Sequence, residues 1–196
     1  MNWLLFLSQL PANPSSLRVN VWRKLRAAGA LGLQNGVWLL PENPDQSKFL
    51  TDLLEAIQSQ GASGQIFTVT PKDETIEQDI ITRFRSDRDE EYTEFLEHSL
   101  EFLAEIEKES KKQKFTFAEL EENEQDFQRL SNWLEKIQKR DFVGGEKARE
   151  AAEELEKCRN VFEVFSAEVY NRQTTETTSD AELADNFKID TIQEEE

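Results

Sequence analysis

The 196-residue sequence predicts an α+β protein, with a sheet-containing first part and a helical second part. Up to about residue 72, apolar runs of strand length alternate with segments of helical periodicity. From residue 73 the apolar residues keep helical spacing to about residue 172. The remainder is polar, acidic and aperiodic, which is typical of a disordered tail. We therefore predict three segments, at residues 1–72, 73–172 and 173–196.

Three features of the sequence predict the first strand, the first helix and the first turn, in chain order. The run "WLLFLSQL", residues 3–10, is apolar almost throughout and predicts a buried strand. A helix is predicted between Pro14 and Gly29, because apolar residues recur there at helical spacing and glycine commonly ends a helix. Asn35-Gly36 lies between two short apolar runs and predicts a tight hairpin turn, since such turns need positive φ at both central positions.

A second helix and a fourth strand complete the first part. The helix is predicted from Asn43 or Asp45 as cap to Gly61, and "GQIFTVTP" at 64–71 reads as a strand. The order strand, helix, strand, strand, helix, strand is the split βαβ, or ferredoxin-like, pattern. Such a unit is small for a single core. We therefore expect the second sheet face, or an edge, to pack on the helical part or on a second subunit.

The second part predicts three helices in a mostly antiparallel arrangement. The first runs to about Lys112, and a polar break follows. Thr116 and Glu119 have capping-box spacing at the start of the next helix, which continues through Lys139. Gly144-Gly145 separates it from the third helix. Short connections of this kind favour antiparallel neighbours.

The charge of the chain is unevenly distributed. The net charge is −17, but residues 1–72 hold six Lys/Arg and four Asp/Glu. Residues 73–172 hold 16 Lys/Arg and 28 Asp/Glu, and the tail at 173–196 holds one Lys/Arg and eight Asp/Glu. Only the first segment can approach a polyanion without electrostatic repulsion, so a nucleic-acid footprint over the whole surface is excluded.

The sequence contains no recognisable catalytic or metal-binding set. His98 is the single histidine and Cys158 the single cysteine, and each is expected to be structural or merely exposed. Small metal-dependent nucleases with this strand order hold their metal through an Asp at the end of the first strand. Here Ser8 and Gln9 stand at that place and cannot supply an anionic ligand. We predict a protein that is not an enzyme and uses no metal or cofactor.

The cellular location follows from cysteine use and hydropathy. One cysteine cannot form an internal disulfide, which fits a reducing compartment. The apolar start has no Lys or Arg before it, so we interpret it as a strand rather than a secretory signal. No apolar run approaches the ~20 residues that span a bilayer. We predict a cytoplasmic protein that does not contact membranes.

A basic cluster in the first helix is the main candidate binding site. Arg18, Arg23, Lys24 and Arg26 lie on one short helix together with Trp22. Arginine binds phosphates and other oxyanions through its planar fork. Three interpretations are open: a solvated helix face, a contact with DNA backbone or an oxyanion, and a contact with an acidic protein face, including that of this chain.

A second basic cluster, Arg83, Arg85 and Arg88, follows the fourth predicted strand and lies in the first long helix. Arg88 falls on the apolar stripe, where a charge must be paired. Its expected partners are Glu91 or Tyr92, and the alternative is an oxyanion or a carboxylate from another segment.

Three stretches together resemble one family. They are "WLLFLSQLPANPSSLRVNVWRKLRAAGALGLQNGVWLLP", "SDRDEEYTEFLEHSLEFLAEIEKE" and "FTFAELEENEQDFQRLSNWLEKIQKRDFVGG". They are similar to the N-terminal domain of the ChrB chromate-resistance regulators, over about residues 3–170. The first stretch also resembles, more faintly, the middle domain of PaaX-type phenylacetate repressors.

The resemblance implies a cytoplasmic regulatory module of the chromate or oxyanion response, acting in transcriptional control. Family members commonly carry a further C-terminal domain, where this chain has an acidic tail. We expect a homo-oligomer, specifically a homodimer, with DNA contacted through the basic helix. The alternative is an interaction or assembly module that binds a protein partner and no DNA.

Overall fold

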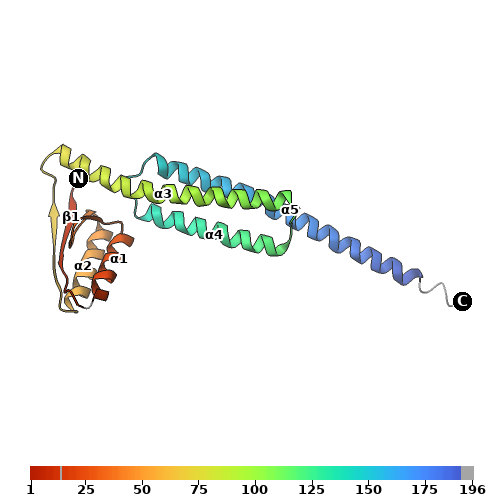
Figure 1. The fold of residues 1–196 in the computed structure, drawn as a ribbon, viewed down its shortest axis with the longest axis horizontal. Helices are drawn as coiled ribbons and strands as arrows, with labels where there is room; N and C mark the ends of the chain where they lie inside the picture. The colour runs from red at the N-terminus through yellow and green to blue at the C-terminus, as the bar shows by residue number, and fades with distance from the viewer. Residues whose placement is uncertain (14, 191–196) are drawn as a thin grey trace. The chain divides into compact units, whose positions relative to one another are not determined.

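The computed structural model describes residues 1–13 and 15–190, with side chains up to residue 173. It confirms the α+β class, with a four-stranded antiparallel sheet and five helices in the described part (Figure 1). The elements are β1 (Trp3–Gln9), α1 (Ser15–Ala27), β2 (Leu31–Gln34), β3 (Val37–Pro41), α2 (Pro44–Gln58), β4 (Ser63–Val69), α3 (Glu74–Lys111), α4 (Phe117–Lys139) and α5 (Glu146–Asp190).

The chain divides into two compact units. The sheet unit comprises Met1–Glu91 and Lys136–Gly145, and the helical unit comprises Tyr92–Glu135 and the residues from Glu146 on. The sheet unit therefore extends beyond the segment 1–72 and includes the start of α3. The reason lies in the second face of the sheet, which needs apolar cover.

The sheet has the strand order β2-β3-β1-β4, with every neighbouring pair antiparallel. The predicted Asn35-Gly36 turn joins β2 to β3. Gly36 has φ +74°, and its carbonyl accepts a hydrogen bond of 2.7 Å from the backbone N–H of Ser8. A Cβ at Gly36 would lie 2.4 Å from the carbonyl oxygen of Ser8, so the turn requires glycine for both its φ and its close approach to β1.

The two faces of the sheet bury different clusters. On one face α1 and α2 cover a core that includes Leu4, Phe6 and Leu40. On the other face Trp3, Leu31 and Leu39 pack with Phe84 from the start of α3. The start of α3, which belongs to the sheet unit, therefore covers part of this second face.

Local signals explain the starts of α2 and α4. The side chain of Asn43 accepts a hydrogen bond of 2.9 Å from the backbone N–H of Gln46, so Asn43 is the cap of α2. Thr116 caps α4 by accepting a bond of 3.3 Å from the N–H of Glu119. Both caps stand where the sequence predicts them.

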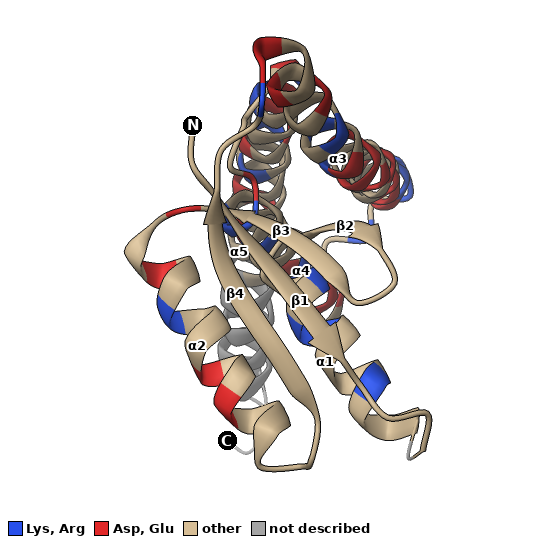
Figure 2. Cartoon of the chain, turned by 90° about the vertical axis from the view of Figure 1, so that its left-hand side faces the viewer, with Lys and Arg blue, Asp and Glu red and all other residues tan. Residues whose placement is uncertain are grey.

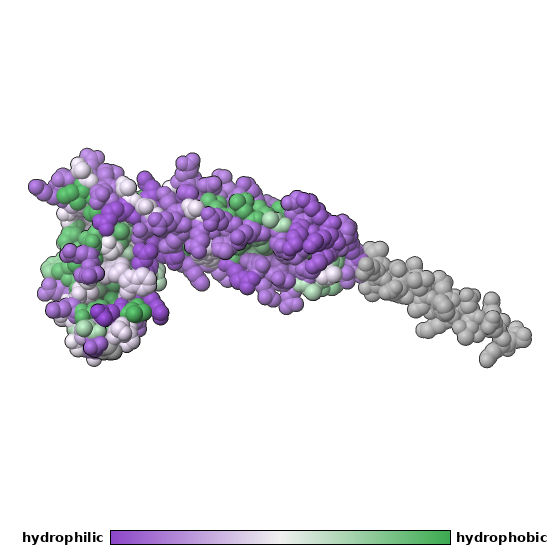
Figure 3. All heavy atoms as spheres, in the orientation of Figure 1, coloured by the Kyte–Doolittle hydropathy of each residue, from purple (hydrophilic) through white to green (hydrophobic). Residues whose placement is uncertain are grey.

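The helical unit has an aromatic core. Phe102 and Phe162 each lie against Phe127, with ring centroids 6.2 and 5.7 Å from it, and Phe115 lies 5.4 Å from Phe165. The visible surface of the unit is mostly hydrophilic in Figure 3, which agrees with its many acidic residues. These contacts join α3, α4 and α5 into one bundle.

The predicted tail begins inside α5, whose backbone is helical up to Asp190. The sequence contains neither glycine nor proline after Gly145, so nothing forces the helix to end earlier. Residues 191–196 and the side chains from residue 174 lie outside the described part. The disorder predicted for 173–196 stays a prediction.

Candidate nucleic-acid interface

The α1 helix presents its basic residues outward because its apolar stripe faces inward. Leu17, Val21 and Leu25 are buried against the sheet at spacings of four residues. The intervening positions are polar or basic, and the helix contains no acidic residue. The first Asp or Glu of the whole chain is Glu42. The α1 helix therefore brings positive charge to the surface of an acid-free segment.

The four candidate residues of α1 have different environments. Arg23 and Lys24 are exposed, and within the described part neither forms an ion pair. Arg18 is exposed and donates a hydrogen bond of 3.0 Å to the carbonyl of Ala12. Arg26 donates one of 2.8 Å to Asp87, so its charge is already compensated. Arg26 therefore differs from the other three candidates, which form no ion pair among the described residues.

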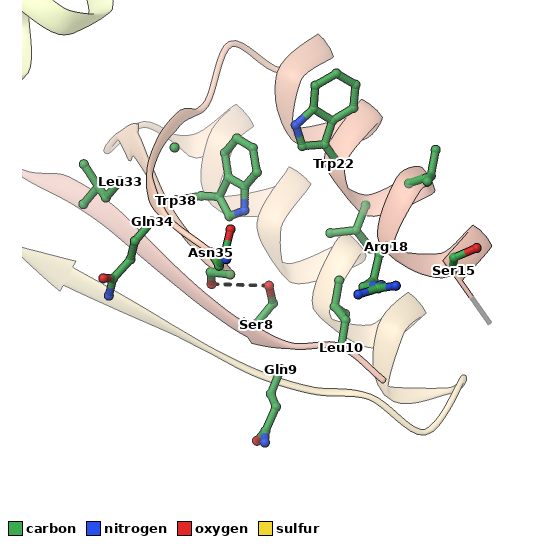
Figure 4. Close-up of a pocket in the computed structure, with 14 residues that line it drawn as sticks. Ser8, Gln9, Leu10, Ser15, Arg18, Trp22, Leu33, Gln34, Asn35 and Trp38 are labelled. Atoms are coloured by element: carbon green, nitrogen blue, oxygen red, sulfur yellow. Dashed lines mark hydrogen bonds between the residues drawn. The ribbon is translucent and has the colours of Figure 1, made fainter. Parts of the chain in front are cut away.

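A groove of about 850 Å³ lies between α1 and the β2–β3 hairpin (Figure 4). Arg18 and Trp22 line it from α1, and Asn35 and Trp38 line it from the hairpin. None of its lining residues is acidic. Trp22 is 53% exposed, which is unusual for so large an apolar ring. Indole rings beside arginine in an open groove suit contacts with an anion or with an aromatic group.

A second hollow of about 420 Å³ shares Trp22, Gly32 and Trp38 with the groove. It also contains Arg26, Arg83 and Asp87. The ring of Trp38 lies on the backbone of Gly32, where a Cβ would come within 3.4 Å of it.

The second basic cluster does not converge on one point. Arg83 donates a hydrogen bond of 3.0 Å to the carbonyl of Gly32, which ties α3 to β2. Arg85 is exposed. Arg88 is buried and pairs with Glu91 at 3.0 Å, the partner that the sequence predicts. The cluster is therefore largely structural, and only Arg85 is exposed.

Arg88 occupies an unusual environment for a cation. It is 4% exposed, and its Nη1 has no hydrogen-bond partner among the described residues. Burial lowers the pKa of Arg88, and the neighbouring Arg140 lowers it further, while Glu91 opposes both. Glu91 also binds Arg140, whose Nε lies 3.0 Å from Oε2. One carboxylate therefore compensates two arginines.

Sequence reasoning missed Trp38 and Asp87. Trp38 looked like an ordinary strand residue, and only the pairing of Trp38 with Gly32 places it at the groove. Asp87 immediately precedes Arg88, but its partner Arg26 is far away in the sequence. Neither contact has a local sequence signal.

The single histidine and the single cysteine have different environments: His98 is half-exposed and Cys158 is buried. His98 lies 2.9 Å from Glu101 and packs edge-on against Trp133. Cys158 is fully buried, and burial raises the pKa of its thiol to about 11. A thiol with this pKa is almost wholly protonated at neutral pH and is a poor nucleophile.

Among the described residues, the His, Cys, Asp and Glu side chains form no group of three or more that could hold a metal ion. Within the same part of the chain, none of the helices has the length and hydropathy needed to cross a membrane.

Comparison with known proteins decides the family. The sequence model of the family described as "Protein ChrB, N-terminal" matches residues 18–176. This chain belongs to the ChrB N-terminal family. The match includes all four basic candidates of α1, the hairpin and most of the helical unit.

A curated relative supports the assignment. Protein ChrB of Cupriavidus metallidurans (strain ATCC 43123 / DSM 2839 / NBRC 102507 / CH34) is 31% identical over 94 residues, which cover 48% of this chain. The aligned part spans 28% of the length of that ChrB protein. No solved structure matches the chain.

Proposed function

We propose that this chain is a non-enzymatic regulatory module of the chromate or oxyanion response and contacts DNA backbone through α1. One observation carries the DNA contact: Arg23 and Lys24 are exposed and unpaired among the described residues, on a helix that itself contains no acidic residue. Membership of the ChrB N-terminal family supports the regulatory role.

A chain of net charge −17 can approach a polyanion only through a part of its surface that is not acidic. The acidic helices repel DNA, so binding requires that α1 face the duplex. Arg18 at the groove adds a third exposed cation beside Arg23 and Lys24. Phosphate contacts from a few cations give weak, salt-dependent and sequence-independent affinity. We therefore expect modest affinity from this chain alone.

A binding measurement tests the proposal. Fluorescence anisotropy would use labelled duplex from the region upstream of the chain's own gene, at ~50 mM and ~150 mM salt, with and without chromate. We expect binding that is measurable at the lower salt and much weaker at the higher salt. A change on adding chromate would connect the module to the oxyanion. Absence of binding at ~50 mM salt would contradict DNA contact.

The groove favours a second candidate function, a protein-interaction module without DNA contact. Its exposed Trp22 and its lack of acidic residues would suit an acidic, aromatic peptide segment of a partner. Lack of DNA binding, together with a partner whose binding is lost in Trp22→Ala, would favour this alternative.

Two finer assignments accompany the proposal. The element order and the order β2-β3-β1-β4 support a ferredoxin-like sheet unit. The single, buried cysteine supports a cytoplasmic location.

A further inference from the structure

The groove between α1 and the hairpin exists because the edge strand β2 adds little bulk to that face of the sheet. Leu31 packs on the opposite face with Phe84. The next residue, Gly32, lies opposite Trp38 in the strand register and has no side chain. The α1 face of the sheet therefore ends at this edge in an open hollow beside an indole ring.

Trp22 lines the groove from α1 and belongs to neither buried cluster of the sheet unit. It follows Val21, which is buried, so the helix turns the indole away from the core. Val19 and Leu33 are also exposed and line the same groove, so Trp22 is not an isolated exposed ring. Contiguous exposed apolar groups mark binding surfaces.

Polar groups accompany these apolar side chains. Arg18 lies about one helical turn before Trp22 and lines the groove from the same helix (Figure 4). Its guanidinium donates one hydrogen bond to the carbonyl of Ala12, which holds the side chain in place, and its remaining N–H donors are open to an oxyanion. Asn35 lines the groove from the turn with an exposed amide that both donates and accepts hydrogen bonds.

Charge restricts the ligands that the groove can hold. In Figure 2 the α1 helix carries blue residues and no red ones, and the hairpin strands β2 and β3 are tan. Arg18 is the one charged side chain among the described residues that line the groove. The groove therefore favours a ligand that combines a negative charge with an aromatic ring.

We propose that this groove binds an unpaired nucleotide of a DNA strand, with the base stacked on Trp22 and the phosphate on Arg18. This base contact rests on the proposed DNA contact through α1 and extends it. Stacking on an aromatic side chain suits every base. Amide side chains such as that of Asn35 hydrogen-bond to base edges. The groove volume of about 850 Å³ lies within the usual range of ligand sites.

A nucleotide fits the groove better than the acidic, aromatic peptide of the alternative function. A base offers donors and acceptors to Asn35, which a phenylalanine ring lacks. The neighbouring phosphates of the same strand can reach Arg23, which is exposed and follows Trp22 on α1. A base that is paired in a duplex is held inside its stack, so only an unpaired base can reach Trp22.

Fluorescence anisotropy with labelled probes of about 12 nucleotides tests this base contact at ~50 mM salt. The probes are a single strand of mixed sequence, an abasic strand of the same length and a duplex. The abasic strand keeps the phosphates but lacks the bases. We expect the wild-type chain to bind the single strand about ten-fold more tightly than the abasic strand, a gain within the usual range for stacking one base.

Trp22→Ala should remove the gain from the bases and leave duplex binding unchanged, because the duplex is held through phosphate contacts. Trp22→Phe keeps an aromatic face and should retain most of the gain. The matched control is Phe117→Ala in the helical unit, which removes a ring that is 50% exposed and should leave the gain intact. Circular dichroism would verify that each variant is folded.

Equal affinity for the single strand and the abasic strand, or a gain that persists in Trp22→Ala, would overturn the base contact. Equal binding of all three probes would overturn it and leave the DNA contact through α1 standing. Lack of binding by every probe would contradict the proposed function as well, so the two claims fail separately. An acidic, phenylalanine-containing peptide that binds the wild-type chain and not Trp22→Ala, without any gain from bases, would assign the groove to a protein partner instead.

Discussion

Phe84 of α3 stacks on Trp3 of β1, with ring centroids 5.3 Å apart and an angle of 14° between the rings. The stack joins the start of a helix to the second face of the sheet. Trp3 is 1% exposed and Phe84 3% exposed, so each ring is shielded by the other and by its neighbours. The sheet unit therefore depends on residues beyond its last strand.

Replacing Phe84 with alanine should destabilise the sheet unit by about 3–5 kcal/mol, the usual cost of removing a buried phenylalanine. The loss includes both the buried apolar area and the cavity beside Trp3. Urea denaturation followed by tryptophan fluorescence would measure it. Phe117→Ala, at an exposed position, is the control and should cost less than about 1.5 kcal/mol. Equal costs for the two variants would contradict a structural role for the stack.

The stack of Phe84 on Trp3 also predicts how a fragment of residues 1–72 would behave. A fragment of those residues would lack Phe84 and would expose Trp3, Leu31 and Leu39. We expect it to aggregate or to remain unfolded, whereas a chain that includes the start of α3 and the loop at 140–145 should fold. Soluble expression with a cooperative thermal transition for residues 1–72 alone would contradict this expectation.

Gly36 and Gly61 offer a matched pair for testing the hairpin. Both have positive φ, at +74° and +77°, but a Cβ at Gly61 meets nothing within 4 Å. Gly61→Ala should therefore cost only the left-handed backbone penalty, about 1–2 kcal/mol. Gly36→Ala should cost clearly more, because its Cβ would clash with the carbonyl of Ser8 and displace a hydrogen bond to β1. Equal losses in thermal stability would show that the turn moves freely away from β1.

Glu91 should be important for stability because it compensates both Arg88 and Arg140. Glu91→Gln leaves the buried guanidinium of Arg88 without its ion-pair partner. The cost should be about 3 kcal/mol, at the lower end of the range for breaking a buried pair, because the side chain of Glu91 is still 22% exposed.

The control for Glu91 is Glu101→Gln, which removes a carboxylate that is 74% exposed beside His98. Exposed pairs contribute at most about 1 kcal/mol, so this variant should change stability little. Chemical denaturation of both variants at neutral pH would compare them. A Glu91 variant no less stable than the Glu101 variant would mean that another group compensates Arg88.

The sequence predicted features with a local cause. The Asn35-Gly36 turn, the caps at Asn43 and Thr116 and the pair of Arg88 with Glu91 all depend on residues within a few positions. Contacts between distant segments left no such signal. Contact with an acidic face of this chain was one of the open alternatives for the basic helix, but nothing in the sequence pointed to Asp87 as the partner of Arg26, and Trp38 was not predicted at the groove. Periodicity indicates which face of a helix is buried, but it does not say what that face meets.

The most direct test of DNA contact is the salt dependence of binding by the double variant Arg23→Ala/Lys24→Ala. Each phosphate contact adds about 0.9 to the slope of log K against log salt. Loss of two contacts should therefore make the slope shallower by about 1.8 and weaken binding to all sequences alike. Because both side chains are exposed, stability should hardly change.

Lys111→Ala/Lys112→Ala in the helical unit is the matched control, since it also removes two exposed positive charges. Fluorescence anisotropy over ~50–200 mM salt, a range in which phosphate contacts change affinity strongly, would compare both variants with the wild-type chain. Our account predicts a shallower slope for the α1 variant alone. An equal change in both variants, or a wild-type slope kept by the α1 variant, would contradict DNA contact through α1.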